Sequence, residues 1–494
     1  MTDKRNLDFK RTLFAGPIRV ILPIMGYIVL YPTILNNSGA KILGLWSMVA
    51  TIPLIVNNLD IGFSLLIKRG FSREDKLEQQ YKDISVSKQF YRTVVFILLV
   101  ITGVIFLFIN VSDLYPQRLL FLSICLTIIG IGEQLVARLY AAALSAKGYN
   151  YLVQYAFIPV PILTVFGSLI GAFWGDPIIG FSIGCCLAAF VQQLVLLGLI
   201  KDRIEKWKER QIGSKMLELP RNSYSLLKRG GYLYGAMSGL ALREVSFRYV
   251  VAFLFGLETA GIWDIAIRVG RTVREVGVAS LSSLYPSFAF FYSNNLKSEI
   301  VRYTQLALTF VLITGGGLIG VILFFVQPIM DLWLGNLTSE LNTITILILI
   351  WNGLTFVSWT FWILLQATNL EKNATIIAWT QNTLTLLFIP IGILLKLEVV
   401  ELTILWILAL SVSELFVFYF VERRLDVFYE TILNRKLFVH FLVFIVMISI
   451  GAYHGLGHFL CIPLWIIFVG FGCLIFSGLN LPGVFYALTA SPKE

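Results

Sequence analysis

Charged side chains interrupt several long apolar runs of this sequence, and they are the residues best suited to bind a ligand. Asp264, Arg268, Arg271 and Glu275 follow one another at intervals of four, three and four residues, with Arg274 beside them. That spacing places the first four on one face of a helix. All seven basic residues inside the apolar runs are arginine, although the chain has 18 lysines and 21 arginines. Because an arginine fork binds phosphate or carboxylate through two hydrogen bonds, this face predicts an anionic ligand.

A further arginine, Arg243, lies near the middle of a neighbouring apolar run. We therefore expect four arginines to contact an anionic headgroup in a central aqueous cavity: Arg243, Arg268, Arg271 and Arg274. The same spacing also allows purely structural ion pairs, because side chains four residues apart on a helix are neighbours. The candidate pairs are Asp264–Arg268, Arg271–Glu275 and Glu244–Arg248. Both interpretations remain open from the sequence.

Two carboxylates, Glu133 and Glu414, also fall near the middle of apolar runs. Burial raises the pKa of a carboxyl group, so either residue is a candidate for coupling transport to a proton or sodium gradient. The alternative is a hydrogen bond to a neighbouring helix, or to Arg138 in the case of Glu133. Asp60 and Arg19 are candidates for gating, although Asp60 could equally serve packing, and Arg19 could simply extend toward the interface.

These charges lie in a chain whose composition is typical of membrane proteins. Of its 494 residues, 57% are hydrophobic and 14% charged. The apolar residues form runs of about 18 to 25, long enough to cross roughly 30 Å of hydrocarbon as helices. The sequence therefore predicts an all-α polytopic membrane protein with about 14 spans. The expected spans cover residues 14–36, 43–67, 93–110, 118–146, 151–173, 177–200, 230–256, 260–289, 303–327, 343–366, 374–395, 402–422, 437–455 and 460–480.

The distribution of basic residues predicts the orientation of these spans. With the N-terminus inside, the inner segments hold 29 of the 39 Lys and Arg residues and the outer segments only three. This positive-inside bias places both termini in the cytoplasm. It also accounts for the net charge of +10 without any nucleic acid. Prolines predict kinks in several spans, among them Pro53, Pro159, Pro286 and Pro390.

An internal repeat predicts how the spans are grouped. Gly44-Leu45-Trp46 opens the second span and Gly261-Ile262-Trp263 opens the eighth, 217 residues later. A weaker match relates Leu144–Gly148 to Leu365–Asn369. Since both pairs occupy equivalent places with the same orientation, we expect two six-helix lobes related by a pseudo-two-fold axis along the membrane normal. The lobes cover residues 1–200 and 230–422, joined by a basic cytoplasmic linker at 201–229 and followed by two additional helices within 437–480.

The sequence contains little that points to catalysis. It has no Walker lysine motif, no G-x-S-x-G and no metalloprotease histidine pair. His454, His458 and Cys461 do not form a convincing metal site, because no acidic partner accompanies them. We therefore expect no catalytic residues, no metal and no cofactor. A membrane enzyme would need a large catalytic loop, and we find none.

The repeated segments resemble a known family. Ile42–Ser47 with Leu59–Gly62, and Gly256–Trp263 continuing through Arg268 to Pro286, are similar to the second- and eighth-span regions of the polysaccharide transport (O-antigen flippase, Wzx-type) family. That family belongs to the multidrug/oligosaccharidyl-lipid/polysaccharide flippase superfamily. The resemblance implies a V-shaped pair of lobes, a cationic central cavity and a place in the bacterial inner membrane.

It also implies a function: flipping an undecaprenyl-diphosphate-linked oligosaccharide, an O-antigen or capsular repeat unit, from the cytoplasmic to the periplasmic leaflet by alternating access. The expected partners are that polyprenyl-linked lipid, membrane lipid, and the polymerase and chain-length proteins of polysaccharide and lipopolysaccharide biosynthesis. Two alternatives from the same superfamily stay open: a cation-coupled multidrug exporter and a lipid II-type flippase. An exporter predicts carboxylates in the first lobe, which Glu133 fits, and few cavity arginines.

Overall fold

A computed structural model describes most of the chain, and all its regular structure is helical. The described residues are 22–53, 63–64, 67, 71, 77–108, 115–147, 149–203, 223–278, 281, 284–335, 339–368 and 370–427. Two of the sequence-predicted site residues, Arg19 and Asp60, lie outside these ranges. So do the last two expected spans and the two histidines near them.

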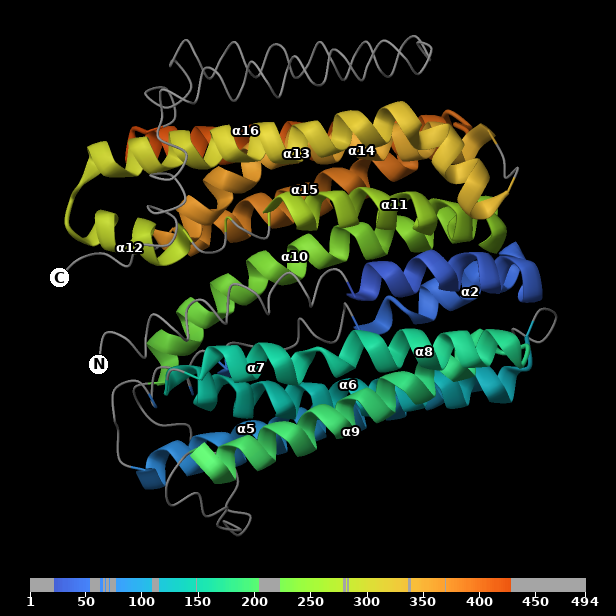
Figure 1. Cartoon of the computed structure of the whole chain (residues 1–494), viewed down its shortest axis with the longest axis horizontal. Helices are drawn as coiled ribbons and strands as arrows, with labels where there is room; N and C mark the ends of the chain where they lie inside the picture. The colour runs from blue at the N-terminus through green and yellow to red at the C-terminus, as the bar shows by residue number, and fades with distance from the viewer. Residues whose placement is uncertain are drawn as a thin grey trace. The chain divides into compact units, whose positions relative to one another are not determined.

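The chain divides into two compact units, Met1–Gly261 and Ile262–Glu494. Residues 22–38 of the first unit are helical and precede its named helices. These are α2 (Ala40–Val49), α5 (Leu77–Phe108), α6 (Gln117–Ala146), α7 (Asn150–Phe157), α8 (Pro159–Phe173), α9 (Pro177–Arg203) and α10 (Ser223–Phe255). Within this unit α5 packs on α6, and α9 packs on both α6 and α8 (Figure 1).

One helix, α11 (Leu257–Val278), begins in the first unit and continues in the second. The second unit then contains α12 (Tyr285–Ser293), α13 (Lys297–Leu334), α14 (Ser339–Ala367), α15 (Glu371–Leu394) and α16 (Val399–Leu425). Here α14 packs on α13 and α16, and α15 packs on α16. The lobe boundaries predicted from the sequence stay predictions, because residues 204–222 of the expected linker are outside the described part of the chain.

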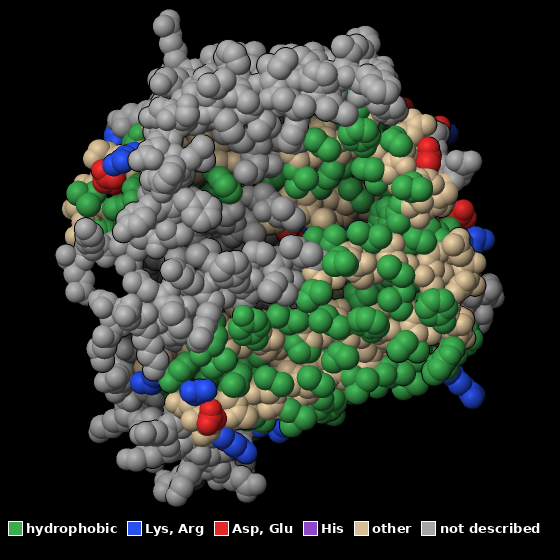
Figure 2. Space-filling view, viewed as in Figure 1, with side chains coloured by type: hydrophobic (Ala, Val, Ile, Leu, Met, Phe, Trp, Pro, Cys, Tyr) green, Lys and Arg blue, Asp and Glu red, His purple; other side chains and the backbone are tan. Residues whose placement is uncertain are grey.

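Length and composition identify the chain as a multi-pass membrane protein. Six described helices are long and apolar enough to cross a bilayer, and α14 is a seventh if its two halves, bent by 46°, form one span. Helix α11 is not among them because it carries six charged side chains. Hydrophobic side chains cover most of the described surface in Figure 2, and the charged ones lie toward its edges. Such a surface suits contact with lipid.

Prolines break three of the expected spans. Helix α2 ends at Val49, whose carbonyl would need the N–H that Pro53 lacks. The fifth span is divided into α7 and α8 immediately before Pro159. The eighth is divided into α11 and α12, with Pro286 in the first turn of α12. The kink expected at Pro390 is different, since this proline lies inside the continuous helix α15.

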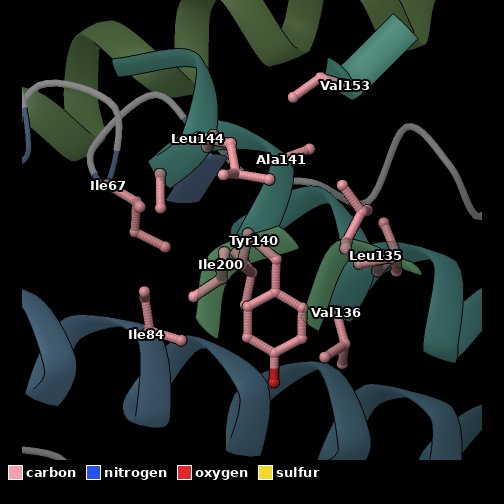
Figure 3. Close-up of a cluster of buried hydrophobic side chains, with 14 of the residues drawn as sticks. Ile67, Ile84, Leu135, Val136, Tyr140, Ala141, Leu144, Val153 and Ile200 are labelled. Carbon is pink, nitrogen blue, oxygen red and sulfur yellow. The ribbon is translucent and has the colours of Figure 1, made fainter. Parts of the chain in front are cut away.

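The core of the first unit is centred on α6, which is buried along much of its length. Figure 3 shows Tyr140 in the middle of this cluster, with its hydroxyl directed toward α5. There Lys88 Nζ donates a hydrogen bond of 3.5 Å to the tyrosine oxygen. Leu135, Val136 and Leu144 are fully buried around it. A dry, closely packed core of this kind makes the first unit resistant to deformation.

Local geometry supports the internal repeat. Gly39 and Gly256 have φ angles of 83° and 89°, a region that favours glycine, and each immediately precedes a helix, α2 and α11 respectively. They are 217 residues apart, the same separation as the Gly-x-Trp motifs. Sequence and backbone conformation thus recur together.

The two motif tryptophans also make matching contacts. Trp46 meets the ring of Phe181 on α9 edge-on, with centroids 6.0 Å apart and an angle of 83°. Trp263 meets Trp406 on α16 at 5.5 Å and 67°. The motif tryptophans of α2 and α11 therefore pack on α9 and α16, which correspond to the last expected spans of the first and second lobes.

Turns at equivalent places in the two repeats also contain the same type of backbone hydrogen bond. Tyr149 N donates to Leu144 O at 3.0 Å, and Leu370 N donates to Leu365 O at 3.1 Å. The turns before α9 and α16 repeat this six-residue closure, from Asp176 N to Gly171 O and from Leu397 N to Gly392 O. Each turn of the first unit lies 221 residues before its counterpart in the second unit. The weaker sequence match at Leu144–Gly148 therefore reflects a shared helix-ending turn.

Candidate functional site

The charged face expected from the sequence lies on α11. Asp264 is fully buried, and its Oδ2 accepts a hydrogen bond of 3.1 Å from Arg268 Nε. The Arg268 side chain keeps 18% of its surface exposed. This ion pair is one of the three proposed from the i,i+4 spacing, and the structure confirms it. Because a buried carboxylate needs a partner, Asp264 holds Arg268 in place.

Arg271 and Arg274 follow on the same helix, and both are partly exposed. The guanidinium carbon of Arg274 lies 5.8 Å from the ring centroid of Trp359 on α14, a cation–π distance. Trp359 in turn stacks on Trp362, with centroids 6.5 Å apart and an angle of 19°. Arg274 thus lies beside an aromatic pair that the sequence reasoning missed. A tryptophan repeated at i,i+3 on an expected span was the available signal.

Two carboxylates act electrostatically on Arg274: Glu275, its neighbour in the chain, and Glu414 on α16. Glu414 was expected to be a separate candidate for ion coupling. The structure instead places it close enough to interact with a predicted ligand-binding arginine. Gln381 Nε2 on α15 donates a hydrogen bond of 3.0 Å to Glu414 Oε1, so three helices contribute to this group.

Close packing holds α11 against α14 at this site. A Cβ added to Gly270 would lie 2.5 Å from Ile348 Cγ2 and 2.6 Å from Asn352 Nδ2, so only glycine fits without a shift. Nearby, the buried tryptophans Trp263 and Trp351 both pack against Trp406 on α16, at 5.5 and 5.3 Å. Large aromatic contacts of this kind fix the relative positions of α11, α14 and α16.

The fourth arginine of the prediction, Arg243, belongs to α10 in the first unit. Its side chain is only 3% exposed, and its Nη2 lies 3.9 Å from Glu244 Oε1. That separation is at the limit of an ion pair and reflects charge compensation more than a directed hydrogen bond. Arg243 is therefore more deeply buried than the three arginines of α11.

One turn further along α10, Arg248 caps the broken end of α2. Its Nη1 donates a hydrogen bond of 3.1 Å to Ser47 O, and the Tyr249 hydroxyl donates to Met48 O at 3.4 Å. These carbonyls lie where α2 ends before Pro53, because Thr51 N turns back to Met48 O. Arg248 thus satisfies a carbonyl left by the helix break, and its predicted pairing with Glu244 stays a prediction.

The two Gly-x-Trp motifs meet beside this junction. A Cβ on Gly44 would overlap the carbonyl oxygen of Leu257, and one on Gly261 would lie 2.9 Å from Gly44 N. The start of α11 therefore crosses α2 at backbone contact, which requires glycine at both positions. This explains why the motif recurs with glycine.

Glu133, the other coupling candidate, is partly buried on α6 of the first unit. Its charge acts on Cys186 of α9. The adjacent Gln134 Nε2 lies 3.9 Å from Cys185 Sγ, so α6 and α9 share a small polar contact here. Among the described residues, no group of three or more His, Cys, Asp or Glu is placed to hold a metal ion.

Comparison with known proteins identifies the fold. No family model matches the chain, and no curated protein matches it in sequence. Solved structures do match. The lipid II flippase MurJ in an inward-closed conformation aligns with a TM-score of 0.62 at 16% identity, covering 97% of this chain and 99% of its own.

Two other transporters align similarly. One of the MOP superfamily from Pyrococcus furiosus aligns with a TM-score of 0.61 at 13% identity, covering 86% of this chain and 96% of its own. The Vibrio cholerae MATE transporter VcmN in its bent form gives 0.58 at 14%, covering 87% and 99%. The chain therefore has the fold of these membrane transporters and flippases, none of which is described as an enzyme. The O-antigen branch that the sequence resembles stays a prediction.

Proposed function

We propose that this protein is a flippase for a polyprenyl-diphosphate-linked oligosaccharide. It moves the lipid from the cytoplasmic to the outer leaflet of a bacterial inner membrane by alternating access, with both termini in the cytoplasm. The substrate's diphosphate binds arginines of α11, its glycan occupies the polar interior, and its prenyl tail stays in lipid. The proposed energy source is a proton or sodium gradient, and the proposed partners are a polysaccharide polymerase and its chain-length regulator.

The observation that carries the proposal is the set of three partly exposed arginines on α11. Arg271 lies 14 residues after Leu257, or about 21 Å along the helix at 1.5 Å per residue, which is well inside a membrane core. A guanidinium at this depth costs several kcal/mol unless it meets a partner or water, so such residues usually mark a substrate pathway. Arginine is also the side chain best suited to bind a diphosphate.

Structural similarity supports a lipid-linked substrate. The MurJ match extends over 97% of this chain, more than the 86% and 87% of the two other transporters. MurJ is described as a flippase of lipid II, a lipid-linked molecule. A lipid II-type flippase therefore remains the nearest alternative within this proposal.

The test is genetic complementation. The gene is deleted in its host, surface polysaccharide is assayed, and the gene is restored as wild type, Arg271→Lys or Arg271→Glu at matched membrane levels. We expect deletion to abolish the polysaccharide, Arg271→Lys to restore part of it and Arg271→Glu to restore none. Arg118→Glu makes the same charge change at an exposed position and should behave as wild type. Unchanged polysaccharide in the deletion strain would refute the proposal.

One observation favours a second function, the export of organic cations. Glu275 and Glu414 act on the same arginine that lies beside the Trp359 ring, and carboxylates with an aromatic ring also suit a cationic ligand. Several similar structures are of multidrug transporters. If deletion leaves the polysaccharide intact and sensitises cells to cationic drugs, this second function replaces the first.

A further inference from the structure

A row of polar and aromatic side chains runs along α14. It consists of Asn352, Thr355, Trp359, Trp362 and Gln366, spaced at i, i+3, i+7, i+10 and i+14. The row crosses the 46° bend of α14 after Asn352, and the spacing keeps Trp359, Trp362 and Gln366 on one side of the second half. We refer to these five residues as the α14 row. Asn352 Nδ2 and Thr355 Oγ1 donate hydrogen bonds to carbonyls of their own helix, at 2.7 and 2.8 Å.

The α14 row lies against the charged helix α11. Gly270 approaches Asn352 closely enough that a Cβ would lie 2.6 Å from its Nδ2. Farther along, the guanidinium of Arg274 lies 5.8 Å from the Trp359 ring. Two positions of the row, seven residues apart, therefore contact α11.

Two buried members of the row have polar atoms without a hydrogen bond. The Trp362 side chain is nearly inaccessible, with the residue 3% exposed, and its Nε1 has no acceptor among the described residues. Asn352 is 1% exposed, and its Oδ1 has no donor in the same part of the chain. An unused donor and an unused acceptor cost free energy in a dry environment. They are expected where a ligand supplies the missing partners.

Charge argues against an anion at this position. Arg274 is accompanied by two carboxylates, Glu275 and Glu414, so the guanidinium charge is already compensated. A ligand that covers the partly exposed ring of Trp359 and offers hydrogen bonds to the polar groups around it combines hydroxyl groups with apolar C–H faces. A sugar ring has both properties and carries no charge.

We infer that the α14 row, with Arg274, binds the glycan part of the substrate and not its diphosphate. This inference rests on the proposed function and divides its site into two: Arg271 for the diphosphate, and the α14 row for sugar. Trp359 lies 20 residues into α14, roughly 30 Å along the helix at 1.5 Å per residue. In the predicted orientation this is the cytoplasmic end, where a glycan assembled in the cytoplasm would arrive.

Binding of defined lipids to the purified full-length protein in nanodiscs tests the inference. The probes are undecaprenyl diphosphate, undecaprenyl-diphosphate-linked N-acetylglucosamine and the organic cation tetraphenylphosphonium. The variants are Trp359→Ala, Trp359→Phe and the control Trp379→Ala, which removes a tryptophan exposed on α15. Melting temperatures of all variants show whether each has folded.

We expect wild type to bind the sugar-bearing lipid more tightly than undecaprenyl diphosphate. Trp359→Ala should weaken only the sugar-bearing lipid, by about tenfold, as is common for a tryptophan at the centre of a binding site. Trp359→Phe should keep most of the affinity because an aromatic face remains. If the alanine variant does not fold, the preference of wild type for the sugar-bearing lipid still tests the inference. Trp379→Ala should bind as wild type does.

The outcomes separate the two proposals. If a folded Trp359→Ala leaves the preference for the sugar-bearing lipid intact, or weakens both lipids equally, the glycan assignment is wrong while the flippase proposal stands. The same holds if wild type does not distinguish the two lipids. If wild type binds neither lipid but binds tetraphenylphosphonium, and Trp359→Ala weakens that cation, both proposals are overturned in favour of the exporter.

Discussion

Gln381 Nε2 on α15 donates a hydrogen bond of 3.0 Å to Oε1 of Glu414 on α16. The bond holds the carboxyl group near Arg274, on which its charge acts. Glu414 therefore connects the charged face of α11 with the last two described helices of the second unit. Removing the charge of Glu414 would alter the charge balance at Arg274, because charges interact more strongly away from bulk water.

Replacing Glu414 with glutamine tests whether this residue couples transport to a gradient. Glu414→Gln removes the charge but keeps an oxygen that can accept the bond from Gln381. We expect the protein to fold and to lose transport driven by an ion gradient in proteoliposomes. Glu340→Gln, at an exposed position near the start of α14, should keep it. Unchanged gradient-driven transport in the Glu414 variant would exclude Glu414 as the coupling group.

Gly44→Ala tests the contact between the repeated motifs. The added Cβ would overlap the Leu257 carbonyl oxygen, and a backbone atom cannot rotate away as a side chain can. We expect a loss of about 1–3 kcal/mol of stability from overpacking, seen as a lower melting temperature in detergent.

The matched control for this prediction is Gly198→Ala on α9, where no atom lies within 4 Å of the added carbon. Its melting temperature should be unchanged or slightly higher, because alanine favours a helix over glycine. Equal melting temperatures for the two variants would show that the crossing of α2 and α11 tolerates a side chain.

Tyr115 is expected to make the free energy of unfolding of the protein depend on pH in the alkaline range. Tyr115 lies in the turn between α5 and α6, and Asp176 lies in the turn between α8 and α9. The tyrosine hydroxyl donates a hydrogen bond to the Asp176 carboxylate at 2.6–2.7 Å. Burial first, and then Asp176, raise the pKa of the tyrosine above its ordinary value near 10. A raised pKa means that the folded state retains a proton that the unfolded chain releases. The contribution to stability is therefore full below about pH 10 and is lost as the pH rises further.

Tyr115→Phe should lower the melting temperature at pH 7, because Asp176 loses a hydrogen bond worth about 1–3 kcal/mol to a charged acceptor. The variant should also show a smaller fall in melting temperature between pH 9 and 11 than wild type. Tyr155→Phe, at an exposed position on α7, serves as the control. Parallel alkaline curves for Tyr115→Phe and wild type would contradict the assignment.

Much of the fold could be predicted without coordinates, because it depends on local properties of the chain. Apolar runs predicted every long helix from α5 to α16 to within a few residues at most ends. The largest difference is α5, which begins at Leu77 although its apolar run starts near residue 93. A helix continues through polar residues once it leaves the membrane, and hydropathy does not detect that continuation.

The candidate site was predictable only along single helices. The i,i+4 rule predicted Asp264–Arg268 correctly, since both residues lie on α11. The rule could not predict that Arg248 also caps the carbonyl of Ser47, 201 residues earlier in the sequence. No local pattern relates an arginine to a carbonyl exposed by a break in a distant helix.

The sequence by itself therefore determined the membrane class, the repeated Gly-x-Trp motifs and the charged face of α11, because periodicity and hydropathy act over a few residues. The tertiary structure alone decided which groups that face meets. Trp359 reaches Arg274 from α14, and Glu414 acts on it from α16 with Gln381 behind. These partners depend on how helices pack through contacts such as Gly270 against Asn352, and packing is a property of the folded chain.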